Sequence, residues 1–278
     1  MIKRTVAVFQ SIIIVSLLAL IMALFIFDRS HALGSFVWKF VFITLLTDFL
    51  YLSLHLFRRG VNHSDLSFDP TKLTIIIACY NGEDIIKETI DNALVHVNRN
   101  QIIVASDSST DRTAKTAANL GVRAYENKRN VNKAFTISNI VRHVETPYVL
   151  ILDDDTLIGK TFIPTSLLDD GYSAVSFNVM PVAENTIVNK LQTFEYRKSM
   201  FLSKYLRART GTVGNISGAI GLYRTEDLRH QSTRHSGQFG GEDEQRTALL
   251  HIYTKGKGVT YTDSLVETKA PPHFQGVV

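Results

Sequence analysis

Residues 148–159 read YVLILDDDTLIG, and this stretch decides the fold. Tyr148 to Leu152 form an apolar run of the kind that fills a buried strand. Three consecutive carboxylates follow, Asp153, Asp154 and Asp155. Because adjacent negative charges are costly unless something positive compensates them, we expect this strand to end at a site that binds a positive group.

Segments along the chain alternate between strand-like and helix-like patterns. Strand-like runs occur at 73–80, 101–107, 122–126 and 148–152, and helical patterns at 81–97, 109–121 and 132–144. This alternation predicts an α/β fold with a mostly parallel sheet and helices on both faces. The site of such a sheet lies beyond the carboxyl ends of its strands. The polar clusters YNGED, DSSTD and DDDT each follow a predicted strand, so we expect them to meet at one edge.

Two apolar segments precede this domain. Residues 6–27 hold no charge, and residues 36–57 contain Lys39, Asp48 and His55. Each segment is long enough to cross the bilayer core, which takes roughly 20 apolar residues. We therefore expect three regions, a membrane anchor with two transmembrane helices over 1–60, a linker over 61–72 and a domain over 73–278.

The orientation of this anchor follows from its flanking charges. Lys3 and Arg4 precede the first segment, and Arg58 and Arg59 follow the second. By the positive-inside rule, both ends of the anchor and the domain that follows lie in the cytoplasm. A cleaved signal peptide is the alternative for the first segment, but the apolar stretch is too long and no small-residue cleavage site follows. An interfacial helix is the alternative for the second.

The charge of the chain argues against a nucleic-acid-binding protein, and its cysteine count excludes an intramolecular disulfide. The formal net charge of +4 is mild, and no Lys/Arg run, zinc-ligand spacing or helix-turn-helix pattern indicates a nucleic-acid-binding protein. The single cysteine, Cys79, excludes an intramolecular disulfide. It lies inside the apolar run TIIIACY, so we expect a buried structural thiol.

The three carboxylates predict a metal site. On an extended chain Asp153 and Asp155 point the same way, whereas Asp154 points the other way and should tolerate substitution. Two convergent carboxylates suit Mg²⁺ or Mn²⁺. Since Mg²⁺ usually completes its coordination with water and substrate phosphates, a diphosphate substrate fits the site. The alternatives are an acidic turn that caps a helix and a structural Ca²⁺ loop.

Five ordered segments carry a resemblance to a known family: TIIIACYNGED, ASDSSTDRT, VLILDDDT, SGAIGLYR and GGEDEQR. Together they resemble family 2 glycosyltransferases, in particular the membrane-embedded branch that includes cellulose, chitin and hyaluronan synthases. The resemblance spans about residues 73–270. It implies a GT-A fold with a Rossmann-like sheet, an Mg²⁺ or Mn²⁺ cofactor, and transfer of a sugar from a nucleotide sugar. The expected donor is a UDP-sugar, and the expected acceptor is a polysaccharide or a glycolipid.

The same resemblance implies roles for individual residues. Asp243 matches the catalytic base, with Glu242 beside it, and Asp153 and Asp155 match the metal-binding pair. The positions that match the nucleotide-binding site are Ala78, Tyr80, Glu83, Asp107, Lys133 and Asp153. Alternatives stay open for three of these assignments. Tyr80 could be a strand-end aromatic, Asp107 could cap a helix near Ser109, and GGEDEQR could be a helix N-terminus. The family usually has glycine where this chain has Asn132, which weakens the match at Lys133.

The resemblance implies an inverting single displacement, in which Asp243 takes the proton of the attacking hydroxyl. The Gln-x-x-Arg-Trp motif of processive members is absent, and the only tryptophan is Trp38. We therefore expect the domain to be truncated at its C-terminus. The alternative functions are transfer to a polyprenyl phosphate and a catalytically silent nucleotide-binding membrane protein. A phosphorylated receiver domain is disfavoured by the size of the chain and by GGEDEQR.

Overall fold

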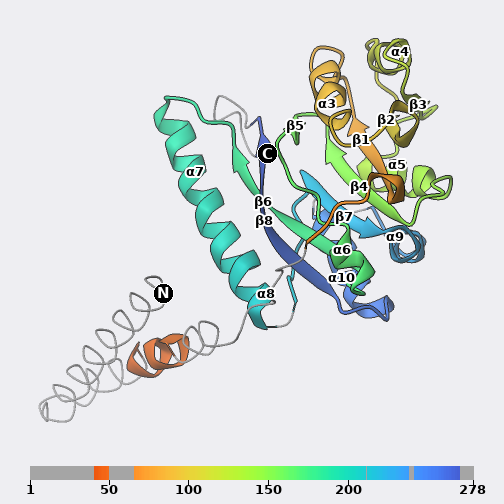
Figure 1. Ribbon diagram of the computed structural model, residues 1–278. Helices are drawn as coiled ribbons and strands as arrows, with labels where there is room; N and C mark the ends of the chain where they lie inside the picture. The colour runs from red at the N-terminus through yellow and green to blue at the C-terminus, as the bar shows by residue number, and fades with distance from the viewer. Residues whose placement is uncertain (1–40, 50–65, 211, 238–240, 270–278) are drawn as a thin grey trace, which may run out of the picture. The chain divides into compact units, whose positions relative to one another are not determined.

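The computed structural model describes residues 41–49, 66–210, 212–237 and 241–269 (Figure 1). The chain divides into two compact units, Met1–Gly60 and Val61–Val278.

In the first unit, residues 41–49 are helical. The predicted span 6–27 and the remainder of 36–57 lie outside the described residues. Within the described ranges, no helix combines the length and the apolar character needed to cross a bilayer. The two transmembrane helices therefore stay a prediction.

The described residues of the second unit form an eight-stranded sheet with the strand order β3-β2-β1-β4-β7-β6-β8-β5. The strands are β1 Leu73–Cys79, β2 Ile102–Ser106, β3 Arg123–Glu126, β4 Tyr148–Asp153, β5 Thr156–Leu157, β6 Ala174–Pro181, β7 Ile220–Arg224 and β8 Val259–Thr268.

Helices cover both faces of this sheet (Figure 1). The α-helices are α3 Ile86–Ala93, α4 Thr113–Asn119, α5 Lys133–Val141, α6 Ser166–Asp169, α7 Ile187–Ser199, α8 Leu206–Thr210, α9 Thr225–Ser232 and α10 Glu242–Tyr253. Two 3₁₀ turns, η1 Pro70–Lys72 and η2 Arg99–Gln101, precede β1 and β2, and a π-helical segment, η3 Met200–Tyr205, joins α7 to α8.

Strand order reverses at β1, and this reversal positions the site. β1 pairs in parallel with β2 on one side and with β4 on the other, and β2 pairs in parallel with β3. In doubly wound sheets, ligands bind in the crevice that forms beyond the carboxyl ends of the strands at such a switch point. The fold therefore directs attention to the ends of β1 and β4.

The prediction of a mostly parallel sheet is correct for the β3-β2-β1-β4 half and for the β6–β8 pair, and it is wrong for the remaining pairs. β7 lies antiparallel between β4 and β6, and β5 pairs antiparallel with β8. The sheet is therefore mixed. The sequence could not reveal this, because an apolar run such as AIGLYR fills a buried strand equally well in either direction.

The core on both sides of β1 explains its composition. All seven residues of β1 are buried. Ile75 and Ile77 pack with the α3 residue Ile90 on one face, and Ile76 packs with the α5 residue Ile137 on the other. A strand covered on both faces reads as continuous apolar sequence rather than an alternating one. Alternation along the strand then places Ala78 on the α5 face and Cys79 on the α3 face.

Two predicted helices are shorter in the structure. The helix predicted over 81–97 is α3, which begins at Ile86, and the one predicted over 109–121 is α4, which begins at Thr113. The preceding residues form two loops that bond to each other. Thr110 N donates to Asn81 Oδ1 at 2.7 Å, and Gly82 N donates to Thr113 Oγ1 at 2.9 Å. Asn81 thus joins two loops and does not cap α3.

Candidate active site

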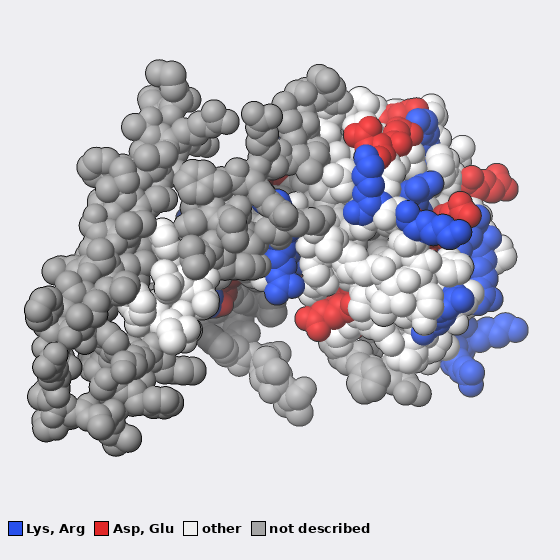
Figure 2. All heavy atoms as spheres, turned by 90° about the horizontal axis from the view of Figure 1, so that it is seen from below, with Lys and Arg blue, Asp and Glu red and all other residues white. Residues whose placement is uncertain are grey.

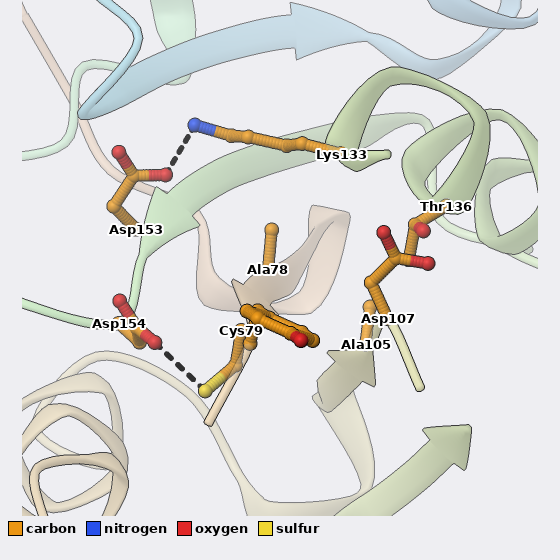
Figure 3. Close-up of a pocket in the computed structure, with 9 residues that line it drawn as sticks. Ala78, Cys79, Ala105, Asp107, Lys133, Thr136, Asp153 and Asp154 are labelled. Carbon is orange, nitrogen blue, oxygen red and sulfur yellow. Dashed lines mark hydrogen bonds and ion pairs between the residues drawn. The ribbon is translucent and has the colours of Figure 1, made fainter. Parts of the chain in front are cut away.

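A pocket of about 260 Å³ opens at the carboxyl ends of β1 and β4 (Figure 3). The lining residues come from β1, β2, β4 and α5 and from the turns that follow the three strands. They are Ala78, Cys79, Tyr80, Ala105, Asp107, Lys133, Thr136, Asp153 and Asp154. The pocket thus lies where the strand order predicts a ligand.

Strand register brings three of these residues into one row. Ala78 is the direct partner of Ala105 on β2 and of Asp153 on β4. Since paired residues in a parallel sheet point to the same face, all three lie on the α5 side. The two small side chains leave space above the sheet, and Asp153 borders that space (Figure 3).

Lys133, the first residue of α5, is the ion-pair partner of Asp153 (Figure 3). Its Nζ also donates to Gly218 O at 2.9 Å and lies 3.8 Å from Glu242 Oε1. Burial raises the pKa of Asp153, and the Lys133 charge acts in the opposite direction. One ammonium group therefore connects the end of β4 with the start of α10.

Asp154 turns to the opposite face, as predicted. Its Oδ2 accepts a hydrogen bond from Cys79 Sγ at 2.8 Å, and burial raises its pKa (Figure 3). A Cβ on Gly82 would lie 2.4 Å from that sulfur and 2.7 Å from that oxygen. Cys79 is buried, as expected, and burial raises the pKa of its thiol. Because Asp154 lines the pocket within this tight contact, we no longer expect it to tolerate substitution.

Asp155 has different partners from Asp153. Its Oδ1 accepts hydrogen bonds of 3.2 Å from the hydroxyls of Thr156 and Thr268, and it does not line the pocket. Among the described residues, no group of three or more His, Cys, Asp or Glu side chains could hold a metal ion. The structure therefore does not test the predicted pair Asp153 and Asp155 as metal ligands.

The donor chemistry nevertheless fits a hard divalent cation. The turn after β4 offers carboxylate oxygens alone, and one or two of these suffice for Mg²⁺. Three carboxylates follow one another there, Lys133 pairs with Asp153, and the charges of Asp154 and Asp155 both raise the pKa of Asp153. A cation would relieve this excess of negative charge.

Asp107 is held so that one oxygen remains for a ligand. Its Oδ1 accepts from Asn127 Nδ2 at 2.8 Å and from Val131 N at 2.9 Å. No donor in the described part of the chain reaches Oδ2. The alternative of a helix cap is wrong, because α4 begins at Thr113 and Asp111 accepts from its backbone N–H. Asp107 therefore presents a free acceptor at the pocket.

Two of the predicted nucleotide-binding residues differ in placement. Tyr80 lines the pocket and is 53% exposed, which suits an aromatic platform for a base. Glu83 does not line it. Its carboxylate lies 2.6 Å from Arg112 Nη2 and accepts from the Arg112 backbone N–H at 3.0 Å, and these bonds lower its pKa. Glu83 holds two loops together, and a direct role toward a nucleotide stays a prediction.

Asn132 occupies the position where the family usually has glycine, and its backbone explains why glycine is common there. Its φ is +73° and its ψ is 163°, a combination that is essentially confined to glycine. Its Oδ1 caps α5 at Phe135 N, and its Nδ2 donates to Gly237 O at 3.0 Å. The departure from glycine therefore preserves the backbone that aims Lys133.

The first turn of α10 separates its acidic residues. Glu242 lies 3.8 Å from Lys133 Nζ and 3.7 Å from Arg246 Nη2. No hydrogen bond or ion pair within the described ranges engages the carboxylate of Asp243. A Cβ on Gly218 would be in ordinary contact with Asp243 Oδ2 at 3.7 Å. Among the described residues, Asp243 is thus the carboxylate of this turn that no hydrogen bond or ion pair occupies. The alternative for GGEDEQR, a helix N-terminus, is also correct, because α10 begins at Glu242.

A buried lysine lies behind this turn. Lys204, in η3, is 3% exposed, and its Nζ donates to Asn215 O. Burial lowers the pKa of Lys204 to about 8, against the charges of Asp243 and Glu244, which act to raise it. Nothing in the sequence around Lys204 distinguishes it from the exposed Lys198, because the π-helical turn that buries it leaves no clear pattern.

Some residues of the site were not predicted. Thr136 and Ala105 line the pocket, Gly218 supplies a carbonyl to Lys133, and Arg246 is buried beside Glu242. Ala105 could have been found from strand register, since it pairs directly with Ala78. Thr136 follows Lys133 by one helical turn, and Arg246 follows Glu242 by four residues, so helical spacing could have found both. The bond from Lys133 to Gly218 joins segments far apart in the chain.

Comparison with known sequences identifies a family for this chain. The family described as glycosyl transferase family 2 matches residues 74–231, more than half of the chain. A poly-β-1,6-N-acetyl-D-glucosamine synthase of Staphylococcus aureus is 28% identical over 183 residues, which is 60% of this chain and 44% of that protein. The synthase of Staphylococcus epidermidis is 25% identical over 167 residues. The chain thus spans less than half the length of these relatives.

Solved structures show a similar fold. A mannosyltransferase from Pyrobaculum calidifontis, in complex with GDP-mannose and Mn²⁺, superposes with a TM-score of 0.58 at 18% identity, over 81% of this chain and 64% of that one. Staphylococcus aureus TarS superposes with a TM-score of 0.53 at 17% identity, over 72% of this chain and 37% of that one. At this level of identity the likeness concerns the fold, a Rossmann-like sheet of the GT-A type.

Proposed function

The chain belongs to glycosyl transferase family 2, and from this premise we propose that it is an inverting, metal-dependent glycosyltransferase. The proposed donor is a UDP-sugar, and the proposed acceptor is a growing polysaccharide. The names of the staphylococcal relatives favour UDP-N-acetylglucosamine as the first donor to test.

One observation carries this proposal. The pocket presents a free acceptor oxygen, Asp107 Oδ2, together with the ion pair of Lys133 and Asp153 (Figure 3). A nucleoside diphosphate has complementary groups. Its base N–H would bind Asp107 and stack on Tyr80, and its phosphates would approach Lys133.

The divalent cation belongs to the same proposal. Asp153 and Asp155 would hold Mg²⁺ or Mn²⁺, which neutralises charge on the departing diphosphate when bound. The Lys133 ammonium adds a fixed positive charge at the same end of the pocket.

Asp243 is the proposed general base. A sugar hydroxyl is a poor nucleophile, and a carboxylate within hydrogen-bond reach takes its proton as the new bond forms. Neither an ion pair nor a hydrogen bond engages the carboxylate of Asp243 within the described residues. Glu242 faces Lys133 and Arg246, and Glu244 Oε1 accepts from Asn215 Nδ2 at 3.5 Å. We assign Glu242 to hold Lys133 and α10 in position. Attack by the hydroxyl in one displacement inverts the anomeric carbon.

We also propose that the domain is cytoplasmic and anchored by the two apolar segments 6–27 and 36–57. The basic residues that flank these segments support that orientation. Protease protection of the full chain in sealed vesicles measures it directly. Cleavage between residues 73 and 269 only from the cytoplasmic side is the expected outcome.

The donor site can be tested with a substitution that changes one atom. In Asp107→Asn, the amide oxygen can still accept from Asn127 and Val131, while the NH₂ group replaces the free acceptor Oδ2. We expect the full chain with Mn²⁺ to release UDP from UDP-N-acetylglucosamine, and this variant to lose UDP binding in calorimetry. Glu126→Gln, an exposed change at the end of the adjacent strand β3, is the matched control. UDP binding without turnover in the unsubstituted full-length protein would instead favour a silent nucleotide-binding protein.

A further inference from the structure

Helix α7 presents apolar side chains to solvent. Ile187, Leu191 and Phe194 are 78%, 56% and 64% exposed. They are spaced four and three residues apart, so they form one stripe along the helix. The stripe continues into η3, where Phe201 and Leu202 are 47% and 48% exposed.

The opposite side of α7 is the side that packs on the domain. Asn189 is buried, Tyr196 is partly buried, and Met200 at the start of η3 is buried. The helix lies beside β6 (Figure 1). With 3.6 residues per turn, the packed side and the apolar stripe lie on opposite sides of the helix. A surface helix of a soluble domain normally has charged and polar residues where this stripe lies.

Positive charge borders the stripe. Lys190, Arg197 and Lys198 are exposed on α7, and Glu195 is the only acidic residue of that helix. Lys198 lies 4.0 Å from Glu195. Lys190 and Arg197 have no ion-pair partner in the described part of the chain. Apart from the buried Lys204, residues 187–209 hold five basic residues and one acidic residue, a difference of +4.

The charges of the domain are otherwise mixed. Figure 2 shows Lys and Arg side chains beside Asp and Glu side chains on the face seen there. An apolar stripe bordered by unpaired cations is the pattern of helices that lie in the plane of a membrane interface. A second copy of the chain fits less well, because a twofold contact would bring the same cations together.

We propose that α7 and η3 form a docking face for an anionic membrane surface. The apolar stripe enters the interfacial region of the bilayer, and Lys190 and Arg197 pair with anionic headgroups. Lys198, which lies within the stripe, extends its ammonium group to the headgroups while its methylenes cover apolar surface. This face is separate from the pocket residues, so it does not depend on the proposed catalytic function.

Spin labels in the full chain can test this face. In proteoliposomes of phosphatidylcholine with phosphatidylglycerol, a nitroxide is placed at Phe194→Cys or, as a matched control, at Ile252→Cys on α10, which is 67% exposed. Cys79 is buried and its thiol pKa is raised, so the unsubstituted chain measures the labelling background. We expect the label at position 194 to be more accessible to oxygen than to a water-soluble nickel chelate, and the label at 252 to show the reverse.

Charge reversal completes the test. The double substitution Lys190→Glu and Arg197→Glu, made in the 194-labelled chain, should restore access of the nickel chelate, as should vesicles of phosphatidylcholine alone. Equal nickel access at 194 and 252 in anionic vesicles would overturn the proposal. Shielding at 194 that is accompanied by dipolar broadening and persists in phosphatidylcholine would also overturn it, in favour of a contact between two copies.

Discussion

Two runs of three acidic residues lie near each other in this fold, and they are organised differently. Asp153, Asp154 and Asp155 end a strand, whereas Glu242, Asp243 and Glu244 begin a helix. In the first run, strand alternation sends Asp153 to Lys133 and Asp154 to Cys79. In the second, helical rotation turns Glu242 toward Lys133 and Arg246 and leaves the carboxylate of Asp243 without an ion pair or hydrogen bond among the described residues.

Lys133 is the link between the two runs, since it lies against both Asp153 and Glu242. Chemically similar carboxylates therefore have different partners, because the backbone directs them differently. In the proposed mechanism, one run holds charge at the phosphate end of the pocket and the other provides the base. Substitution of Lys133 or of residues near the two runs tests this division, from the largest expected effect to the smallest.

Removal of Lys133 should have the largest effect, because both runs lose their shared cation. Lys133→Met leaves Asp153 and Glu242 without that ammonium group, and losing one partner of a fully buried pair costs about 3–5 kcal/mol. The Lys133 and Asp153 side chains are 25% and 30% exposed, so we expect about 2 kcal/mol here, with loss of UDP binding. Urea unfolding and calorimetry measure the two effects. Lys128→Met, an exposed change in the preceding loop, should alter neither.

Gly82→Ala should move Asp154, the second carboxylate of the first run, away from the pocket. The new Cβ would lie 2.4 Å from Cys79 Sγ and 2.7 Å from Asp154 Oδ2, so one of them has to move. Overpacking of this kind costs about 1–3 kcal/mol. Thermal unfolding should show this loss. The matched change Gly218→Ala, whose Cβ would be 3.7 Å from Asp243 Oδ2, should leave stability nearly unchanged. Equal stability of Gly82→Ala and the unsubstituted chain would mean that the Cys79–Asp154 contact is not tight.

The buried Lys204 feels the charges of Asp243 and Glu244 in the second run, and we expect it to make the stability of the fold depend on pH. Burial lowers its pKa from 10.5 to about 8 in the folded chain. Between about pH 8 and 10.5 the unfolded chain keeps a proton that the folded chain has lost, so this group makes stability rise with pH. Below about pH 8 both states are protonated and the slope disappears. Lys204→Met should remove the rise in unfolding measurements at constant ionic strength, whereas the exposed change Lys198→Met should keep it. An unchanged slope in Lys204→Met would contradict the assignment.

Asn132→Gly should have the smallest effect. Glycine relieves the backbone at φ +73° and ψ 163°, which costs a non-glycine residue roughly 1–3 kcal/mol, but it loses the cap to Phe135 N and the bond to Gly237 O. These contributions nearly cancel, so stability should change by less than about 1 kcal/mol. Asn132→Ala loses the bonds and keeps the strain, and should be about 1–2 kcal/mol less stable. If both variants are equally stable, the backbone strain is not real.

The sequence predicted the elements that depend on local pattern. The strand predicted over 148–152, the helix predicted over 132–144 and the opposite directions of Asp153 and Asp154 all follow from periodicity, and β4 and α5 lie within a few residues of those bounds. The position of the pocket follows from the rule for strand ends in α/β sheets. These features need only neighbouring residues and the topology they imply.

Other features depend on contacts that the sequence does not encode locally. The antiparallel direction of β7, the loop contact of Glu83 with Arg112 and the burial of Lys204 each require segments that are remote in the chain. The contacts of Asp154 were not predicted for the same reason, because alternation gives the direction of its side chain but not the groups that lie there. Cys79 and Gly82 come from a different strand and turn.

The most direct test compares Asp243→Asn with Glu242→Gln in the full-length protein. General base catalysis contributes roughly 10²- to 10⁴-fold, so Asp243→Asn should lose that much in kcat for UDP release while UDP affinity and the unfolding midpoint stay unchanged. Glu242→Gln should instead lower the unfolding midpoint and retain a larger share of kcat, because Glu242 faces Lys133 and Arg246. Full activity in Asp243→Asn, with the loss confined to Glu242→Gln, would contradict the division of roles within this turn.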